Sequence, residues 1–255
     1  MAISARTAIL FNAAAALIVV SAVGAVVRGW IYTAKSVPCD QRYRSVMLMP
    51  LEKDGEPLTA ADLQARSGGR DIGLLDNVEI GRMPGAPARV AMKVNLPKGS
   101  IAPESGDLRI GGMSFPWEPR AVRAQSAVCL SYSVMLSTDF DMSQNGVLPG
   151  IVRRNDAVDD ERFPVHVAWF NTNESGVVHK IQTKSEHPAA SDAATTPPAE
   201  KPAPNFEFEA KTFDLPKGRW ARINQELVLN KPGASDGVLR IWVDGRLALE
   251  RTDMR

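Results

Sequence analysis

The chain has 255 residues, of which 44% are hydrophobic, and its 30 lysines and arginines nearly balance its 29 aspartates and glutamates. This length gives room for one sizeable β domain with additions. The near-zero net charge excludes a global electrostatic field that would recruit nucleic acid, so any polyanionic partner would need a local basic patch.

An uncharged run of mainly Ala, Val, Ile and Leu covers residues 8–27, between Arg6 and Arg28. A helix of about 20 residues spans about 30 Å, the thickness of the hydrocarbon core of a bilayer. We therefore predict an N-terminal transmembrane helix within residues 1–30. It would anchor the protein in the inner membrane, with its domain in the periplasm or outside the cell. A cleaved signal peptide is the alternative, because Ala22 and Gly24 are small residues where cleavage could occur, and the protein would then be secreted.

Two cysteines, Cys39 and Cys129, are present. In an oxidising compartment they could form a disulfide, and otherwise they would be two buried thiols. Two cysteines without a close histidine do not have the spacing of a metal site, and the sequence contains no phosphate-binding or calcium-binding loop. We therefore expect neither a metal nor a cofactor.

Residues 31–70 are predicted to connect the anchor to the main domain, which we place at residues 71–255. A short strand is expected at residues 45–49, and a short helix after Leu58 with Thr59 as its N-cap. We interpret residues 51–70 as a surface connection.

Short alternating stretches, separated by Gly and Pro, predict β-strands in the rest of the chain. The clearest lies at residues 128–137, where Val128, Leu130, Tyr132 and Val134 alternate with cysteine and serine, so that one face can be buried. Further strands are expected at residues 77–80, 88–96, 108–115, 163–170, 176–182, 206–213, 220–229 and 238–243, with a return strand from residue 247. This pattern favours an all-β sandwich of two antiparallel sheets.

Residues 184–205 interrupt the strands with five prolines and almost no large apolar side chain. Such a composition buries too little surface to offset the entropy of ordering, so we predict a disordered insert. The sequence ends shortly after the return strand, and an unprotected sheet edge there could pair with a partner strand.

Three motifs occur in a specific order. Residues 90–100 contain a strand and a Pro-x-Gly-Ser turn, residues 130–150 contain a strand, an Asp-Phe-Asp turn and Leu-Pro-Gly, and residues 218–245 form a late hairpin. Together they resemble the polysaccharide lyase family 14 domain found in alginate and glucuronan lyases. The resemblance covers residues 77–255. It implies a concanavalin-like jelly-roll sandwich, here preceded by the N-terminal transmembrane helix, and an acidic polysaccharide as the partner.

Lyases of this family cleave uronans by β-elimination, which needs a cation on the uronate carboxylate, a base for the C5 proton and an acid for the leaving oxygen. The resemblance assigns these roles to a lysine in a Gly-Gly-Lys-Leu-Pro-Gly loop, a serine and an arginine on the next strand, and two tyrosines on the strand after it. The corresponding residues here are Val147, Pro164, His166, His179 and Ile181. A valine can neither donate a proton nor neutralise a carboxylate, so we predict a degenerate site that binds acidic polysaccharide.

The two histidines keep an enzymatic alternative open. His166 and His179 lie on adjacent predicted strands, and if they share a face they could act as an acid/base pair near pH 7. The other interpretation is that both are packed or solvated strand residues. An active lyase with non-standard residues and a structural envelope protein are therefore the alternative functions.

Four further residues are candidates for binding. Arg153 and Arg154 follow the Leu-Pro-Gly turn and could hold uronate carboxylates, unless they form a solvated loop pair. Trp117 and Trp169 could stack on sugar rings, although tryptophans in a β-sandwich also serve as core residues.

Overall fold

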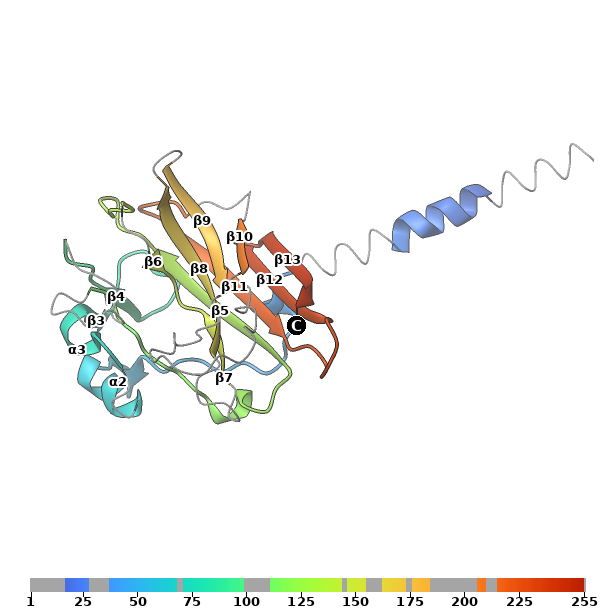
Figure 1. The fold of residues 1–255 in the computed structure, drawn as a ribbon. Coiled ribbons are helices and arrows are strands. Elements are labelled where there is room, and N and C mark those ends of the chain that lie inside the picture. The colour runs from blue at the N-terminus through green and yellow to red at the C-terminus, as the bar shows by residue number, and fades with distance from the viewer. Residues whose placement is uncertain are drawn as a thin grey trace, which may run out of the picture.

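The computed structural model describes residues 17–27, 37–67, 71–98, 111–143, 146–154, 162–172, 176–183, 206–209 and 215–254. Two larger antiparallel sheets form its body (Figure 1). In the first, the strand order is β10-β9-β8-β6, and β7 also pairs with β8; in the second it is β13-β12-β11-β5. Their bounds are β5 Ala127–Met135, β6 Gly146–Val147, β7 Ile151–Arg154, β8 Arg162–Thr172, β9 Gly176–Thr183, β10 Phe206–Glu209, β11 Trp220–Val228, β12 Gly237–Val243 and β13 Arg246–Met254. The prediction of a mainly antiparallel β fold is confirmed.

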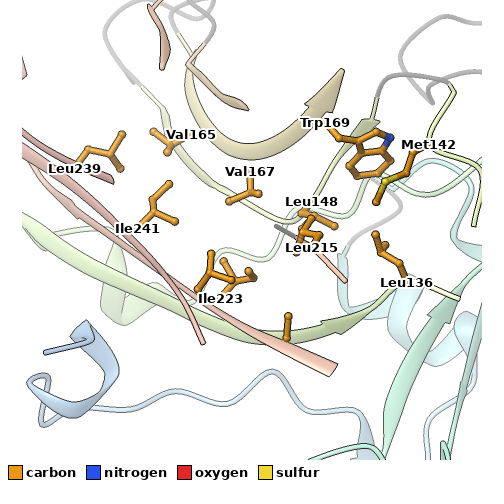
Figure 2. Packing of buried hydrophobic residues seen from close by; sticks show 12 residues of the cluster. Leu136, Met142, Leu148, Val165, Val167, Trp169, Leu215, Ile223, Leu239 and Ile241 are labelled. Carbon is orange, nitrogen blue, oxygen red and sulfur yellow. The ribbon is translucent and has the colours of Figure 1, made fainter. Parts of the chain in front are cut away.

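The two sheets enclose one apolar core (Figure 2). Val165 and Val167 of β8 are fully buried, and they face a cluster from the second sheet that includes Ile223, Leu239 and Ile241. Each such side chain contributes about 1.5–3 kcal/mol when it leaves water. A one-residue slip of β8 would move this whole row to the solvent side. The core therefore determines which residues of β8 face inward and which face outward.

The hairpin between β12 and β13 turns at Asp244 and Gly245, as its sequence predicts. Both residues have positive φ angles, 48° and 78°, which is the backbone of a type I′ turn. The Asp244 carboxylate accepts hydrogen bonds from the backbone of Arg222 at 2.8 Å and from the Arg219 guanidinium at 2.9 Å. The turn thereby fixes the register of the second sheet.

A smaller unit precedes the sandwich and lies at the end of the molecule away from β13 (Figure 1). It consists of β1 Glu52–Lys53, β2 Glu56–Pro57, α2 Ala60–Ser67, α3 Leu74–Asn77, β3 Val78–Gly81 and β4 Ala91–Val94. Thr59 caps α2 as predicted, since its hydroxyl accepts from the Asp62 backbone N–H at 3.1 Å while the Asp62 carboxylate accepts from the Thr59 N–H at 2.9 Å.

Two expectations for this region are wrong, and a third lies partly outside the described residues, at 108–110. Residues 45–49 form no strand, because no neighbouring backbone pairs with them in the described part of the chain. Residues 51–70 are more than a surface connection, because Leu58 and Leu63 are buried and Leu63 packs against Leu74 and Val78. Of the strand expected at residues 108–115, the described part forms a single bridge between Ile72 and Ser114.

Two further predictions concern residues that are partly or wholly outside the described ranges. Residues 17–27 are helical, and residues 8–16 of the predicted anchor are not described. Among the described helices, none has the length and apolar character needed to cross a membrane. The predicted insert at residues 184–205 also lies outside the described residues.

The outer face of the second sheet is covered by the segment that begins with the 3-10 helix η1, Cys39–Gln41. Cys39 is disulfide-bonded to Cys129 of β5, with 5.8 Å between the two Cα atoms. The guanidinium of Arg42 lies 5.6 Å from the ring of Trp242, a tryptophan that is fully buried beneath it. This segment therefore covers part of the outer face of the second sheet, over β5, β11 and β12.

Candidate functional site

The outer face of the first sheet is the side of β8 that points away from the core. Val165 and Val167 are inward, so His166 and Ala168 belong to the opposite side. Val147 of β6 pairs with Ala168, which places it on that side too. Val147 is 53% exposed, so solvent reaches this face at β6, whereas Ala168 beside it is fully buried. We use "outer face" below for this surface.

The Leu-Pro-Gly turn between β6 and β7 is held by both sheets. Leu148 is buried in the core, and its backbone N–H donates to the Val167 carbonyl at 2.8 Å. The carbonyl oxygen of Pro149 accepts from the Tyr132 hydroxyl at 3.0 Å and from Gln225 Nε2 at 2.8 Å. The position of the turn on the outer face is therefore fixed by the core beneath it.

Gly150 allows His166 to lie directly over the turn. A Cβ atom at Gly150 would come within 2.1 Å of the Val165 carbonyl oxygen and 2.5 Å of His166 Nδ1, so no larger residue fits. His166 Nδ1 lies 3.1 Å from the Leu148 carbonyl oxygen. Because a carbonyl cannot donate, Nδ1 carries the hydrogen in this contact, and Nε2 is the proton-accepting nitrogen of the neutral ring.

The register separates the two histidines proposed as an acid/base pair. His166 pairs with Gln182, whereas His179 pairs with Trp169. Directly opposed residues share a face, so His179 occupies a position on the core side and His166 a position on the outer face. The structure does not bring the two histidines together. The partner of His179 on β8 is Trp169, which is three residues from His166, and an odd separation along a strand places two residues on opposite faces.

The two arginines after the turn are also separated. Arg153 pairs with Phe163, and Arg154 pairs with Arg162. Neighbouring strand residues alternate between faces, so Arg154 shares the outer face with Val152, which is 49% exposed, and Arg153 does not. The structure adds Arg162, which the sequence reasoning missed because it began the strand at Phe163.

Trp169 belongs to the core and is not available to stack on a sugar. It is 4% exposed, and its ring meets the ring of Phe140 edge to face at 5.5 Å. Gly146 packs against the same ring, since a Cβ there would come within 2.0 Å of it. The prediction that Trp169 stacks on a sugar ring is therefore wrong. Residues of β8 alternate between the two faces of the sheet, so Trp169 faces the core together with Val167.

Trp117, by contrast, lies in the smaller unit and is 39% exposed. It lines a pocket of about 230 Å³ together with Met49, Phe115, Arg66 and Arg123. The guanidinium of Arg123 is paired with Glu118 at 2.9 Å. None of these residues belongs to the outer face, so Trp117 is separate from the site built around His166.

On β9, the positions that share this face are Gly176, Val178, Lys180 and Gln182. Lys180 pairs with Ala168, and Gln182 pairs with His166. Within the described residues, no group of three or more His, Cys, Asp or Glu side chains could hold a metal ion. The outer face thus combines apolar, basic and polar positions with the exposed Val147.

A family model for polysaccharide lyase 14 matches residues 86–255. Among solved structures, the chain is similar to the PL-14 alginate lyase from Aplysia kurodai, with 16% identity over 73% of each chain and a TM-score of 0.51. It is also similar to the alginate lyase Aly36B, with 14% identity over 77% of this chain and 73% of that chain and a TM-score of 0.44. The comparison with curated proteins found no match.

Proposed function

Because the chain belongs to the polysaccharide lyase 14 family, we propose that its outer face binds an acidic polysaccharide, alginate or another uronan. The observation that carries the proposal is the pairing of Arg154 with Arg162 on this face. Guanidinium groups bind carboxylates with two parallel hydrogen bonds, which suits a chain of uronates. From Arg162 to Ala168, β8 extends about 20 Å at about 3.3 Å per residue, enough to contact several sugars.

The same proposal holds that the catalytic site is degenerate. Val147 stands where the family resemblance expects the loop lysine, and its side chain is half exposed on the outer face. Losing one preorganised donor to the developing negative charge raises the barrier by about 3–4 kcal/mol. Pro164 and His166 add to this loss, because they occupy the positions of the serine and the arginine. Binding without cleavage is the function that this combination supports best.

One observation favours the enzymatic alternative. The hydrogen bond of His166 Nδ1 to the Leu148 carbonyl leaves Nε2 as the proton acceptor of the neutral ring. In an active enzyme with non-standard residues, His166 would be the base that removes the C5 proton. His179 would have no part in this step, because its position lies on the core side.

We further propose that residues 8–27 anchor the protein in the inner membrane, with the domain on the periplasmic or outer side. The support is the uncharged apolar run itself and the Cys39–Cys129 disulfide, which suits an oxidising compartment. The structural envelope alternative would use β13, the edge strand of the second sheet, as the site for a partner strand.

Affinity electrophoresis of the full chain in detergent, in gels that contain alginate or glucuronan, tests the function. We expect retardation by at least one of the two uronans and no increase in the absorbance of unsaturated uronate. Formation of unsaturated product that His166→Ala abolishes and His179→Ala leaves intact would establish the enzymatic alternative. If the protein shows neither retardation nor unsaturated product, the remaining alternative is a structural envelope protein.

A further inference from the structure

The smaller unit contains a pocket of about 230 Å³ that the proposed function does not use. Three stretches of chain line it, namely residues 49–50, helix α2 and residues 115–123. Leu63 of α2 is 1% exposed, and Met49 and Phe115 pack against the buried cluster to which it belongs. The apolar wall of the pocket is therefore part of the core of this unit, so the pocket is pre-formed, as ligand sites usually are.

The loop that carries Trp117 is held by its own backbone. Pro116 and Pro119 lie on either side of Trp117 and fix two φ angles of the loop. The 3-10 helix η3, Arg120–Val122, follows directly, and the Val122 N–H donates to the Pro119 carbonyl at 3.0 Å. Trp117 nevertheless remains 39% exposed where it lines the pocket. This position offers a large apolar ring face on which a ligand ring can stack.

The same pocket carries two guanidinium groups. Arg123 is paired with Glu118 at 2.9 Å, so its charge is partly neutralised. Arg66 lies in the last turn of α2, and among the residues that the structure describes no hydrogen bond or ion pair involves its guanidinium. The acid of α2, Asp62, already accepts hydrogen bonds from the N–H and the hydroxyl of Thr59, at 2.9 and 2.7 Å. Arg66 therefore has donors for a carboxylate that enters the pocket.

We propose that this pocket binds one uronate residue, with the sugar ring against Trp117 and the carboxylate on Arg66. Sites that enclose a drug-sized ligand have about 300–1,000 Å³, so this smaller pocket suits a single ring and not a chain. The apolar wall matches the C–H face of the ring, and the guanidinium matches the carboxylate in charge and in its two parallel hydrogen bonds. The inference goes beyond the proposed function, which concerns the outer face.

Ligand-observed NMR of the full chain in detergent, with saturation transfer from the protein, tests the pocket with sodium glucuronate, glucose and sodium acetate. Glucuronate offers a ring with a carboxylate, glucose only the ring, and acetate only the carboxylate. We expect wild type to bind glucuronate about tenfold more tightly than glucose, as for the gain of a charged hydrogen bond, and more tightly than acetate. The preference for the acid should decrease as salt is added, because Arg66 is exposed.

Two substitutions separate the contributions of charge and stacking. Arg66→Gln is expected to weaken glucuronate binding about tenfold and to leave glucose unchanged, so that the preference for the acid disappears. Trp117→Ala should weaken both sugars by about threefold to tenfold, whereas Trp117→Phe, which keeps an aromatic face, should stay within about threefold of wild type. Arg82→Gln is the matched control, since Arg82 is an exposed arginine between β3 and β4 of the same unit and does not line the pocket.

Circular dichroism checks that each variant is folded, and Trp117→Leu replaces Trp117→Ala if the alanine variant is not. Glucuronate binding that Arg66→Gln and the Trp117 variant leave unchanged would overturn the inference. Acetate binding as tight as that of glucuronate, or no glucuronate binding to wild type, would overturn it as well. The proposed function fails separately, when no uronan retards the wild type in affinity electrophoresis.

Discussion

Gln225 Nε2 donates a hydrogen bond of 2.8 Å to the carbonyl oxygen of Pro149, and so connects β11 of the second sheet to the Leu-Pro-Gly turn of the first. Gln225 is fully buried, and its Nε2 also lies 3.3 Å from the Tyr132 hydroxyl, which bonds the same carbonyl. The Pro149 carbonyl therefore has two donors within the core. This small polar cluster fixes the turn that supports His166.

We expect that removing either donor alone costs about 1 kcal/mol, because the other still satisfies the Pro149 carbonyl. The double variant Tyr132→Phe, Gln225→Leu removes both donors to that carbonyl, so its loss of stability should exceed the sum of the single losses by about 1 kcal/mol. Urea unfolding of the four proteins measures the difference. Strict additivity would show that the two donors do not share the carbonyl.

Glu226 makes the stability of the protein depend on pH. It is 2% exposed, and its carboxylate accepts hydrogen bonds from Arg42 at 2.8 Å, Arg240 at 2.9 Å and the Tyr43 hydroxyl at 3.1 Å. Burial by itself raises the pKa of this carboxyl group, but the hydrogen bonds from Arg42 and Arg240 outweigh burial and leave the pKa below its ordinary value. A lowered folded-state pKa means that the ionised form is bound more tightly in the folded protein.

Glu226→Gln is therefore expected to reduce stability at pH 7 by about 3–5 kcal/mol, as for a broken buried ion pair. The contribution of Glu226 is complete above its unfolded-state pKa of about 4.3 and is lost as the pH falls through the lower folded-state pKa. The gap between wild type and variant, measured by urea unfolding from pH 7 to pH 2, should begin to narrow only below about pH 4.3 and should shrink further as the pH falls through the lower folded-state pKa. Glu79→Gln, which removes an exposed pair with Lys93, is the control and should cost at most about 1 kcal/mol.

The sequence was sufficient to predict most strands of the sandwich, because burial of one face leaves a period of two that can be read directly. Val165 and Val167 alternate with His166 in this way. Thr59, predicted as an N-cap residue, correctly indicated the start of α2. The strand expected at residues 45–49 failed for the opposite reason. Its apolar residues have the right composition, but no partner strand is available there, and pairing is not encoded within a single stretch.

The site was harder to predict, because it depends on register. Matching the sequence to the family by residue spacing between motifs assigns His179 and Ile181 to the two tyrosine positions. Cross-strand pairing, however, places both residues on the core side of β9. Residue spacing alone does not reveal which face a strand residue occupies, because an insertion of one residue in a hairpin loop exchanges the two faces of the following strand.

The Cys39–Cys129 disulfide is expected to contribute strongly to stability. Its cysteines are 90 residues apart, and closing a loop of this size lowers the entropy of the unfolded chain by an equivalent of about 4–5 kcal/mol. Reduction by dithiothreitol should therefore lower the urea midpoint of the wild type. The Cys39→Ser, Cys129→Ser variant should match the reduced wild type and should not respond to dithiothreitol. A response of this variant would mean that the reductant acts elsewhere.

Gly150→Ala tests the packing of the turn against β8. The added Cβ would lie 2.1 Å from the Val165 carbonyl oxygen, a backbone atom that cannot rotate away. We expect a loss of about 1–3 kcal/mol, as for other overpacked positions, because β7 must move away from β8. Gly81→Ala is the control, since a Cβ at Gly81 meets no atom within 4 Å, and it should be close to neutral.

If the turn positions the binding face, Gly150→Ala should also weaken retardation by alginate under conditions in which the variant is fully folded. If the two alanine variants are equally stable, the Leu-Pro-Gly turn can shift to accommodate a Cβ atom at position 150. The close contact of Gly150 with His166 would then not be what fixes the position of the turn.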